Sequence, residues 1–264
     1  MSFRRIRIVV LLGLLFATAS LTWLEQYIAR GWKGPLVVEL VPINGDRSAA
    51  AAETIAALKA DDFSDIGDFL EREAARYGVQ SGTALKLTVE PALAAHPPAP
   101  PQGGNVLATM AWSLKLRWWV YRQSGQWLPE IGTVKLYVLY HAPEDGRGLA
   151  HSLGLQKGLI GVVHAYASPR QARQNNIVIA HELLHTLGAT DKYGPEGYPV
   201  YPDGVADTTL PEDAPQRAAE IMAGRYLTPG GQLTMPASLA QCVIGAKTAR
   251  EINLDGAFAR QYAH

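Results

Sequence analysis

The sequence predicts an α+β fold in which helices pack on a twisted, mixed β-sheet. Two observations predict it. Short runs of β-branched and aromatic residues, typical of strands, are interspersed with longer segments whose apolar residues recur every three or four positions. The last of the strand-like runs is followed by one long helical segment that carries two histidines. With 264 residues, nearly half of them apolar, the chain can bury a substantial core.

The first thirty residues predict export from the cytoplasm. Three arginines within the first seven residues precede an uncharged, mostly apolar run from Ile8 to Leu24, as in export signals. We expect residues 1–30 to act as an uncleaved membrane anchor, although Ala17-Thr18-Ala19 also fits the cleavage site of a signal peptide. Under both interpretations the domain formed by residues 31–264 lies outside the cytoplasm.

The first half of this domain alternates strands and helices. Leu36–Val41 is a β-branched run between two prolines and predicts a strand, and Thr83–Glu90 alternates apolar and polar residues as a half-exposed strand does. Ala49–Lys59 and Asp62–Tyr77 predict helices, the second from its three- and four-residue spacing. The segment His96–Gly104 is rich in proline and glycine and predicts a connecting loop.

An aromatic segment, Asn105–Gln123, predicts a further helix. Its aromatic side chains could line a substrate groove, but we expect them to pack in the core. The apolar side chains at helical spacing are Leu107, Met110, Leu114, Trp118 and Tyr121.

The second half of the domain predicts two strands and two helices around a long irregular segment. Thr133–His141 and Gly158–Ser168 are strand-like, and Gln171–Leu187 predicts one helix. Lys192–Pro215 is rich in Gly, Pro and Asp, as a loop that serves a site would be. Ser238–Ile252 predicts the last helix.

Composition excludes some classes of partner and of site. Lys plus Arg equals Asp plus Glu, at 24 each, so no net charge indicates a nucleic-acid partner. The single cysteine, Cys242, rules out an intramolecular disulfide and predicts a small buried side chain.

The histidine-bearing helix carries the pattern of a zinc hydrolase. His181 and His185 are four residues apart, which places both imidazoles on one helix face, about 6 Å apart at their Cβ atoms. Two neutral imidazoles so placed can bind one Zn²⁺ ion. Glu182 can take a proton from zinc-bound water without itself binding the metal. We therefore expect zinc as the cofactor and Glu182 as the catalytic base.

A third ligand is expected after a turn. A catalytic zinc site needs three protein ligands and one open position. Gly188 can adopt a positive φ, end the helix and reverse the chain, which would bring the Asp191 carboxylate to the same ion. The rival third ligands are Glu220 and, less favoured, Asp203 and Asp207.

These residues resemble a known family. The series His181-Glu182-x-x-His185-x-x-Gly188-x-x-Asp191 is similar to the elongated motif of metzincin zinc proteases, in the minority variant, of the snapalysin and immune-inhibitor kind, that has aspartate as third ligand. The resemblance implies a metzincin-like sheet with a central zinc-binding helix, followed by an irregular C-terminal subdomain with a methionine turn and a terminal helix.

The resemblance also assigns further positions. The stretch "AEIMAGRY" looks like the methionine turn, with Met222 below the metal ligands. Several metzincins have a tyrosine two residues after that methionine, but here the position is Gly224. Tyr226 and Tyr193 are the nearby candidates for stabilising an oxyanion, but neither matches the position that the tyrosine has in the family.

The expected function is zinc-dependent hydrolysis of peptide bonds in a peptide or protein substrate. The resemblance implies that the substrate lies extended along an edge strand, for which Gly161–Ser168 is the candidate, with Lys192–Pro215 as the opposite wall. Two other interpretations remain open. The protein could be an exported zinc amidase that acts on cell-wall crosslinks, or a membrane-anchored binding protein with an inert motif.

Overall fold

The computed structural model describes residues 3–79, 84–101, 106–124, 131–143, 153–155 and 159–256. The last three residues of the predicted loop His96–Gly104 and the chain between the two predicted strands Thr133–His141 and Gly158–Ser168, apart from residues 142–143 and 153–155, lie outside the described residues.

A five-stranded mixed sheet forms the centre of the molecule, in the order β2-β1-β3-β5-β4. Strands β1 (Leu36–Asn44), β2 (Leu85–Val89), β3 (Val134–His141) and β5 (Ile160–Tyr166) run parallel, whereas β4 (Leu153–Leu155) is antiparallel to β5. The mixed sheet expected from the sequence is confirmed, and the whole is compatible with an α+β class. The position of β5 corrects our prediction for the edge strand, because β5 pairs on one side with β3 and on the other with β4.

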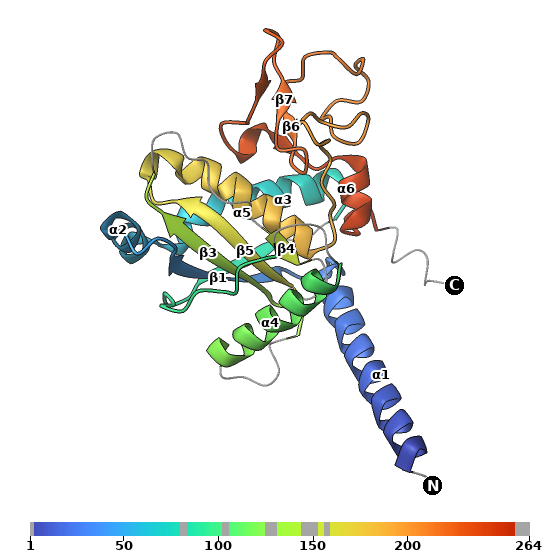
Figure 1. Ribbon diagram of the computed structural model, residues 1–264. Coiled ribbons are helices and arrows are strands. Elements are labelled where there is room, and N and C mark those ends of the chain that lie inside the picture. The colour runs from blue at the N-terminus through green and yellow to red at the C-terminus, as the bar shows by residue number, and fades with distance from the viewer. Residues whose placement is uncertain are drawn as a thin grey trace.

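Helices cover both faces of the sheet (Figure 1). Helices α3 (Ser64–Arg76) and α5 (Ala172–Thr186) lie on one face, and α4 (Val106–Ser124) lies on the other. Successive side chains of a strand point to opposite faces, so Leu136 of β3 packs with α3 and α5 while its neighbour Tyr137 packs with α4. Two hydrophobic cores therefore share one sheet.

Two elements precede α3 in the chain. Helix α2 covers Ala49–Ala57 and is capped by the Ser48 hydroxyl, which accepts a hydrogen bond from the Ala51 amide at 3.1 Å. The short 3-10 helix η1 covers Ala60–Phe63 and leads directly into α3. The predicted helix at Asp62–Tyr77 thus begins slightly later, after this 3-10 turn.

Strand β1 is longer than the sequence predicted, because it continues through Pro42. Proline removes a donor from a sheet ladder and is normally excluded from central strands. Strand β2 reaches only as far as Leu40, which pairs with Val89. The Pro42 carbonyl accepts instead from the Leu93 amide, beyond β2. The missing donor of Pro42 therefore interrupts no ladder.

The N-terminal segment forms one helix, α1 (Phe3–Ala29), that projects from the body (Figure 1). Its end packs on the domain: the Trp32 indole donates to the Ile252 carbonyl at 2.9 Å, and the Asn253 side chain donates to the Arg30 carbonyl at 2.7 Å. Within the described residues, no helix combines the length and the apolar character that a bilayer-spanning helix needs. The membrane anchor stays a prediction.

The C-terminal part is mostly irregular, as predicted for residues 192–215, and lies on the α5 side of the sheet (Figure 1). Its short elements are β6 (Ala219–Glu220), β7 (Tyr226–Leu227), β8 (Leu233–Thr234), the 3-10 helix η3 (Leu239–Gln241), β9 (Cys242–Val243) and α6 (Ala246–Glu251).

The predicted single helix over Ser238–Ile252 is wrong. The chain is extended at β9, where it pairs with β6. Two buried carboxylates then bind the next backbone amides: Glu73 accepts from Ile244 at 2.8 Å and Glu220 accepts from Gly245 at 3.1 Å. These tertiary bonds outweigh the local helix propensity, which is a weak preference by comparison. Cys242 is buried, as expected.

Helix α4 forms where the sequence predicts it, but its orientation corrects our expectation of core packing. The side chains in the α4 core are Trp112, Leu116 and Val120. The apolar side chains at Leu107, Met110, Leu114 and Trp118 are instead exposed.

A histidine pair lies on the α4 face of the sheet. His141 ends β3 and His164 is in β5, and their rings stack with Nε2 of His141 2.9 Å from Nδ1 of His164. Burial and the neighbouring His141 lower the pKa of His164 from 6.5 to about 4. Burial also lowers the pKa of His141. At neutral pH both imidazoles are uncharged.

We predict that this pair destabilises the fold in mild acid. Between pH 6.5 and about 4 the unfolded chain binds a proton at His164 and the folded chain does not. The free energy of unfolding therefore falls as the pH falls through this window. The His164→Gln variant should have a flatter profile. Urea unfolding of both proteins at several pH values measures this difference, in which the shared carboxylate titrations cancel. Parallel profiles would contradict the prediction.

Candidate metal centre

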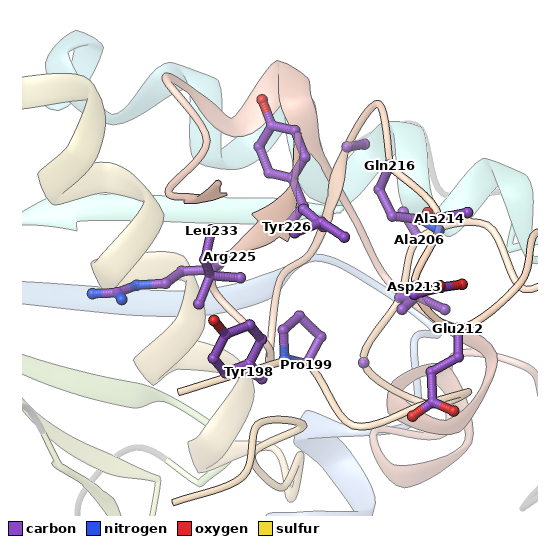
Figure 2. A pocket seen from close by; sticks show the side chains of 14 residues that line it. Tyr198, Pro199, Ala206, Glu212, Asp213, Ala214, Gln216, Arg225, Tyr226 and Leu233 are labelled. Atoms are coloured by element: carbon purple, nitrogen blue, oxygen red, sulfur yellow. The ribbon is translucent and has the colours of Figure 1, made fainter. Parts of the chain in front are cut away.

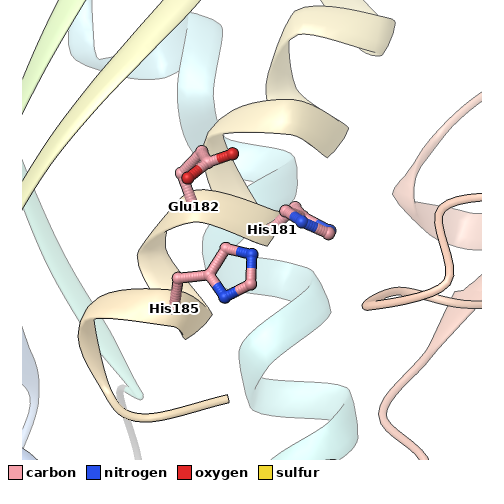
Figure 3. A group of neighbouring side chains, drawn as sticks. All are labelled: His181, Glu182 and His185. Carbon is pink, nitrogen blue, oxygen red and sulfur yellow. The ribbon is translucent and has the colours of Figure 1, made fainter. Parts of the chain in front are cut away.

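Helix α5 brings three donor side chains together. His181, Glu182 and His185 each offer one donor atom, and these atoms lie within 4.8 Å of one another. Figure 3 shows His181 and Glu182 on one turn of α5 and His185 on the next. The imidazole rings are 4.6 Å apart at their centroids and nearly perpendicular, at 84°. The i, i+4 spacing thus places both imidazoles on one helix face, as the sequence predicted.

Backbone carbonyls fix the orientation of both imidazoles. Nδ1 of His181 lies 2.9 Å from the Ile221 carbonyl, and Nδ1 of His185 lies 2.8 Å from the Ala189 carbonyl. A carbonyl only accepts, so each Nδ1 carries a proton and donates it. In the neutral imidazoles, the Nε2 lone pair is then available to a metal ion. This arrangement is typical of histidine metal ligands, whose other nitrogen is held by a carbonyl or carboxylate.

Gly188 ends α5 and reverses the chain, as predicted. Its φ is +107°, which L side chains rarely adopt. The Gly188 amide donates to the backbone carbonyl of His185, and the Ala189 amide donates to the backbone carbonyl of Leu184, each at 3.0 Å. This pair of bonds is a Schellman motif. The same turn places the Ala189 carbonyl against His185, so one backbone reversal both caps the helix and orients a histidine.

The turn also delivers the Asp191 carboxylate to both histidines. Its Oδ1 atom lies 3.3 Å from Nε2 of His181 and 3.1 Å from Nε2 of His185. These are the two nitrogens that the carbonyls leave available. The Asp191 side chain is 44 % exposed, so the centre is open on this side. Asp191 is thus a carboxylate in direct contact with both Nε2 atoms.

The donor set fits a tetrahedral zinc ion. Ligands at about 2.0–2.1 Å in tetrahedral geometry are separated from one another by about 3.3 Å. The two nitrogen-to-oxygen distances at Asp191 are close to this value. Two imidazoles and one carboxylate are also a known ligand set for catalytic zinc, which keeps a fourth position open. His181, His185 and Asp191 could therefore hold a zinc ion with little movement of the side chains.

The electrostatics of the centre favour a cation. Burial opposes the charged form of Asp191, but the hydrogen bonds from His181 and His185 hold its pKa well below the usual range. Burial also disfavours charge on His185, yet the hydrogen bond with Asp191 and the charge of Glu182 raise the pKa of His185. The carboxylates of Asp191 and Glu182 thus both act on the His185 imidazole, and they stabilise a positive charge at this position.

A partly buried ion pair holds the chain on both sides of Asp191. Lys192 Nζ donates to Glu251 and to the Thr190 carbonyl, each at 2.7 Å, and the Thr190 amide and hydroxyl both donate to Glu251. The Lys192 amide donates to the Met222 carbonyl at 3.0 Å. Both neighbours of Asp191 are fixed, and so is the start of its side chain. Sequence reasoning missed Glu251, which is 59 residues from Lys192, and no local signal identifies it.

A tight turn around Met222 lies against the centre. Its preceding residue, Ile221, provides the carbonyl that orients His181. Glu220 is fully buried and accepts from the amides of Met222 and Ala223 and from the Thr248 hydroxyl. Burial raises the pKa of Glu220 above its usual value. Glu220 thus shapes the turn and is bound on both oxygens, which leaves it outside the donor group.

The other rivals for third ligand are also engaged elsewhere. Asp203 accepts from Lys247 at 2.9 Å, and Asp207 accepts from the Thr209 hydroxyl at 2.6 Å. The donor group with all atoms within 4.8 Å of one another, found among the described residues, contains neither of them; it also lacks Asp191, which is favoured by its own contacts with both Nε2 atoms. Tyr193 lies beside Asp191. Burial raises the pKa of Tyr193, and the charge of Asp191 and a hydrogen bond with it raise this pKa further.

A cavity of about 540 Å³ lies in the irregular region beyond the centre. It is lined by the 198–216 segment and by β7 and β8, and Tyr226 is one of its walls. Figure 2 shows Glu212 and Asp213 on one side of the cavity and Arg225 on the other. Part of the irregular segment Lys192–Pro215, which we expect to serve a site, therefore lines this cavity.

Comparison with models of known protein families and with curated proteins gave no match to this chain.

We predict that Gly188→Ala destabilises the protein by about 1–2 kcal/mol, because a Cβ is strained at this φ. The new Cβ would also lie 3.4 Å from the Glu251 carbonyl oxygen. Urea unfolding measures the change. Gly194→Ala is the matched control, since no positive φ or neighbouring atom restricts residue 194. Equal stability of the two variants would contradict the role of the turn.

We predict that Asp191→Ala lowers zinc affinity by at least about 100-fold, more than loss of an outer partner of a ligand does. Isothermal titration of the metal-free protein with zinc measures the affinity. Asp207→Ala, which removes a carboxylate from the same irregular region, should bind zinc as the unaltered chain does. If the two variants bind zinc equally, Asp191 is not a ligand.

Proposed function

We propose that the chain is a zinc-dependent endopeptidase that hydrolyses peptide bonds in an extended substrate. The observation that carries the proposal is the contact of one Asp191 oxygen with both imidazole Nε2 atoms, at 3.3 and 3.1 Å. A hydrolase of this class requires three such ligands around one open position.

His181, His185 and Asp191 would hold the zinc ion. When bound there, zinc polarises the substrate carbonyl and lowers the pKa of a coordinated water molecule towards 7. The hydrogen bonds from Nδ1 of each histidine to a backbone carbonyl leave both Nε2 atoms free of these carbonyls, and they would hold the imidazoles in place for a bound ion. The protein's contribution is a ligand set whose geometry is fixed by α5, by the Gly188 turn and by the Met222 turn.

Glu182 is the proposed general base. Its side chain is buried, and one carboxylate oxygen is within 4.8 Å of the donor nitrogens of both histidines. It takes the proton from the attacking water and returns a proton to the leaving amine as the C–N bond breaks. A base next to the proposed ligands is placed to act on water that the metal would hold.

The support for a metzincin kind of enzyme is positional. The five motif positions lie on one helix and its reversing turn, and the turn around Met222 contacts the ligand His181 through the Ile221 carbonyl. We propose that Met222, buried in the core, is the methionine of this turn. Tyr193 is the proposed oxyanion donor, since it lies beside Asp191 and takes the place of the tyrosine missing at Gly224.

Strand β4 replaces β5 as the proposed substrate-aligning edge. It is the last strand in the order β2-β1-β3-β5-β4 and runs antiparallel to β5. An extended peptide that adds to its outer edge would use main-chain hydrogen bonds, which recognise length and direction more than side chains. The cavity lined by Glu212, Asp213 and Arg225 would then accept one substrate side chain and set preference.

The site is proposed to work outside the cytoplasm, with α1 as the element that attaches the domain to the membrane. Support comes from the arginines at its start and from the apolar side chains that α1 exposes, Ile8 to Leu12 and Phe16 among them. An exported amidase that acts on cell-wall crosslinks would use the same centre. Digestion of casein against purified cell-wall fragments distinguishes the two substrates.

We predict that Glu182→Gln retains zinc and loses hydrolysis by about 10²–10⁴-fold, the range that general-base catalysis contributes. The amide keeps the shape of the side chain but cannot take the proton. Metal content and peptide cleavage are measured on the same samples, with Glu53→Gln as a matched change of an exposed carboxylate on α2, which lines neither the centre nor the cavity. Zinc-loaded Glu182→Gln that cleaves at the unaltered rate would rule out the base.

A further inference from the structure

Helix α4 is apolar on two opposite sides. Its inner side, with Trp112, Leu116 and Val120, packs on the sheet, and Trp119 meets Tyr137 edge to face with ring centroids 4.8 Å apart. Its outer side exposes four large side chains at three- and four-residue spacing, each between 59 and 75 % exposed. This outer stripe consists of Leu107, Met110, Leu114 and Trp118.

Such a stripe requires a partner. A surface helix of a soluble domain normally carries polar residues on its outer side, and a helix that is apolar all round is normally buried. Contiguous exposed apolar side chains mark interaction surfaces. None of its four side chains belongs to either of the two cores.

The charge of α4 indicates which partner. The helix carries three basic residues, Lys115, Arg117 and Arg122, and no acidic residue between Val106 and Ser124. The whole chain is neutral, so this is a local excess of positive charge. Apolar residues with tryptophan on one side and lysine or arginine on the flanks are typical of helices that lie in the headgroup region of an anionic membrane.

The position of α1 indicates the same partner. Figure 1 shows α4 below the sheet and α1 leaving the body on that side, past the end of α4. Glu25 of α1 and Arg117 of α4 interact electrostatically. Burial raises the pKa of Glu25, and the charge of Arg117 opposes this shift. Beyond that link α1 exposes Leu11, Leu12 and Phe16. One lipid surface would cover both sets of apolar side chains.

We propose that the outer stripe of α4 lies on an anionic membrane surface, with Lys115 and Arg122 against the lipid headgroups. The metal centre is carried by α5, on the opposite face of the sheet. A domain docked through α4 therefore presents its open ligand side to the aqueous phase. This docking holds the orientation of the domain whatever depth α1 reaches.

The test uses a fluorescent probe at one residue of the full chain. Leu114→Cys places a thiol-linked, environment-sensitive dye on the stripe, and the one native thiol, Cys242, is buried and does not compete. Ala75→Cys is the matched control, because it is exposed on α3, on the other face of the sheet. Iodide quenching of both dyes is measured with vesicles of phosphatidylcholine and phosphatidylglycerol.

Addition of vesicles is expected to reduce quenching severalfold at residue 114 and to leave residue 75 unchanged. Reversing the stripe's charges with Lys115→Glu and Arg122→Glu should remove the protection, since each basic residue contributes about fivefold to binding an anionic surface. The same reversal at Arg170, which is exposed just before α5, and at Arg173, which is exposed in its first turn, should leave the protection intact.

Equal quenching at residues 114 and 75 in the presence of vesicles would overturn the proposal. Protection at residue 114 without vesicles, rising with protein concentration, would also overturn it and identify a second copy of the chain as the partner. Protection that survives the reversal of Lys115 and Arg122 would overturn the assignment of an anionic surface.

Discussion

The contact of Asp191 with two histidines depends on a backbone reversal more than on the helix that carries them. The helix alone provides two imidazoles with i, i+4 spacing, which is common in proteins without a metal. The positive φ of Gly188 turns the chain so that residue 191 returns to within 3.3 Å of His181. Lys192, Thr190 and Glu251 then hold the returned segment. The candidate centre is therefore a product of helix, cap and loop together.

The same segment joins distant parts of the chain. Glu251, which fixes Thr190 and Lys192, ends α6, and its carbonyl accepts from the side chain of Arg30 at the end of α1. The loop bearing Asp191 is thus connected through one residue to the N-terminal helix. Glu251 therefore connects the packing of the N-terminal segment on the domain to the two residues that flank Asp191.

Sequence patterns predicted the features that depend on local chemistry. The four parallel strands, α5, the glycine cap and the grouping of His181 with His185 follow from periodicity and from the φ that only glycine adopts readily, whereas β4 was not predicted. The edge position of a strand does not, because sheet order is set by tertiary pairing, and β5 proved to be interior. The outward face of α4 was also unpredictable, since apolar residues occupy both of its sides.

The C-terminal region shows why the remainder could not be predicted. Its backbone is ordered by carboxylates that lie far away in sequence: Glu73 accepts from the Ile244 amide, 171 residues on, and Glu220 accepts from Gly245 and Thr248. A buried carboxylate bonded to several donors replaces the hydrogen bonds that a helix or sheet would supply. Glu220 also shapes the turn whose Ile221 carbonyl orients His181. The irregular half of the molecule therefore acts on the centre through its buried charges, and that half is where a sequence pattern has least to say about geometry.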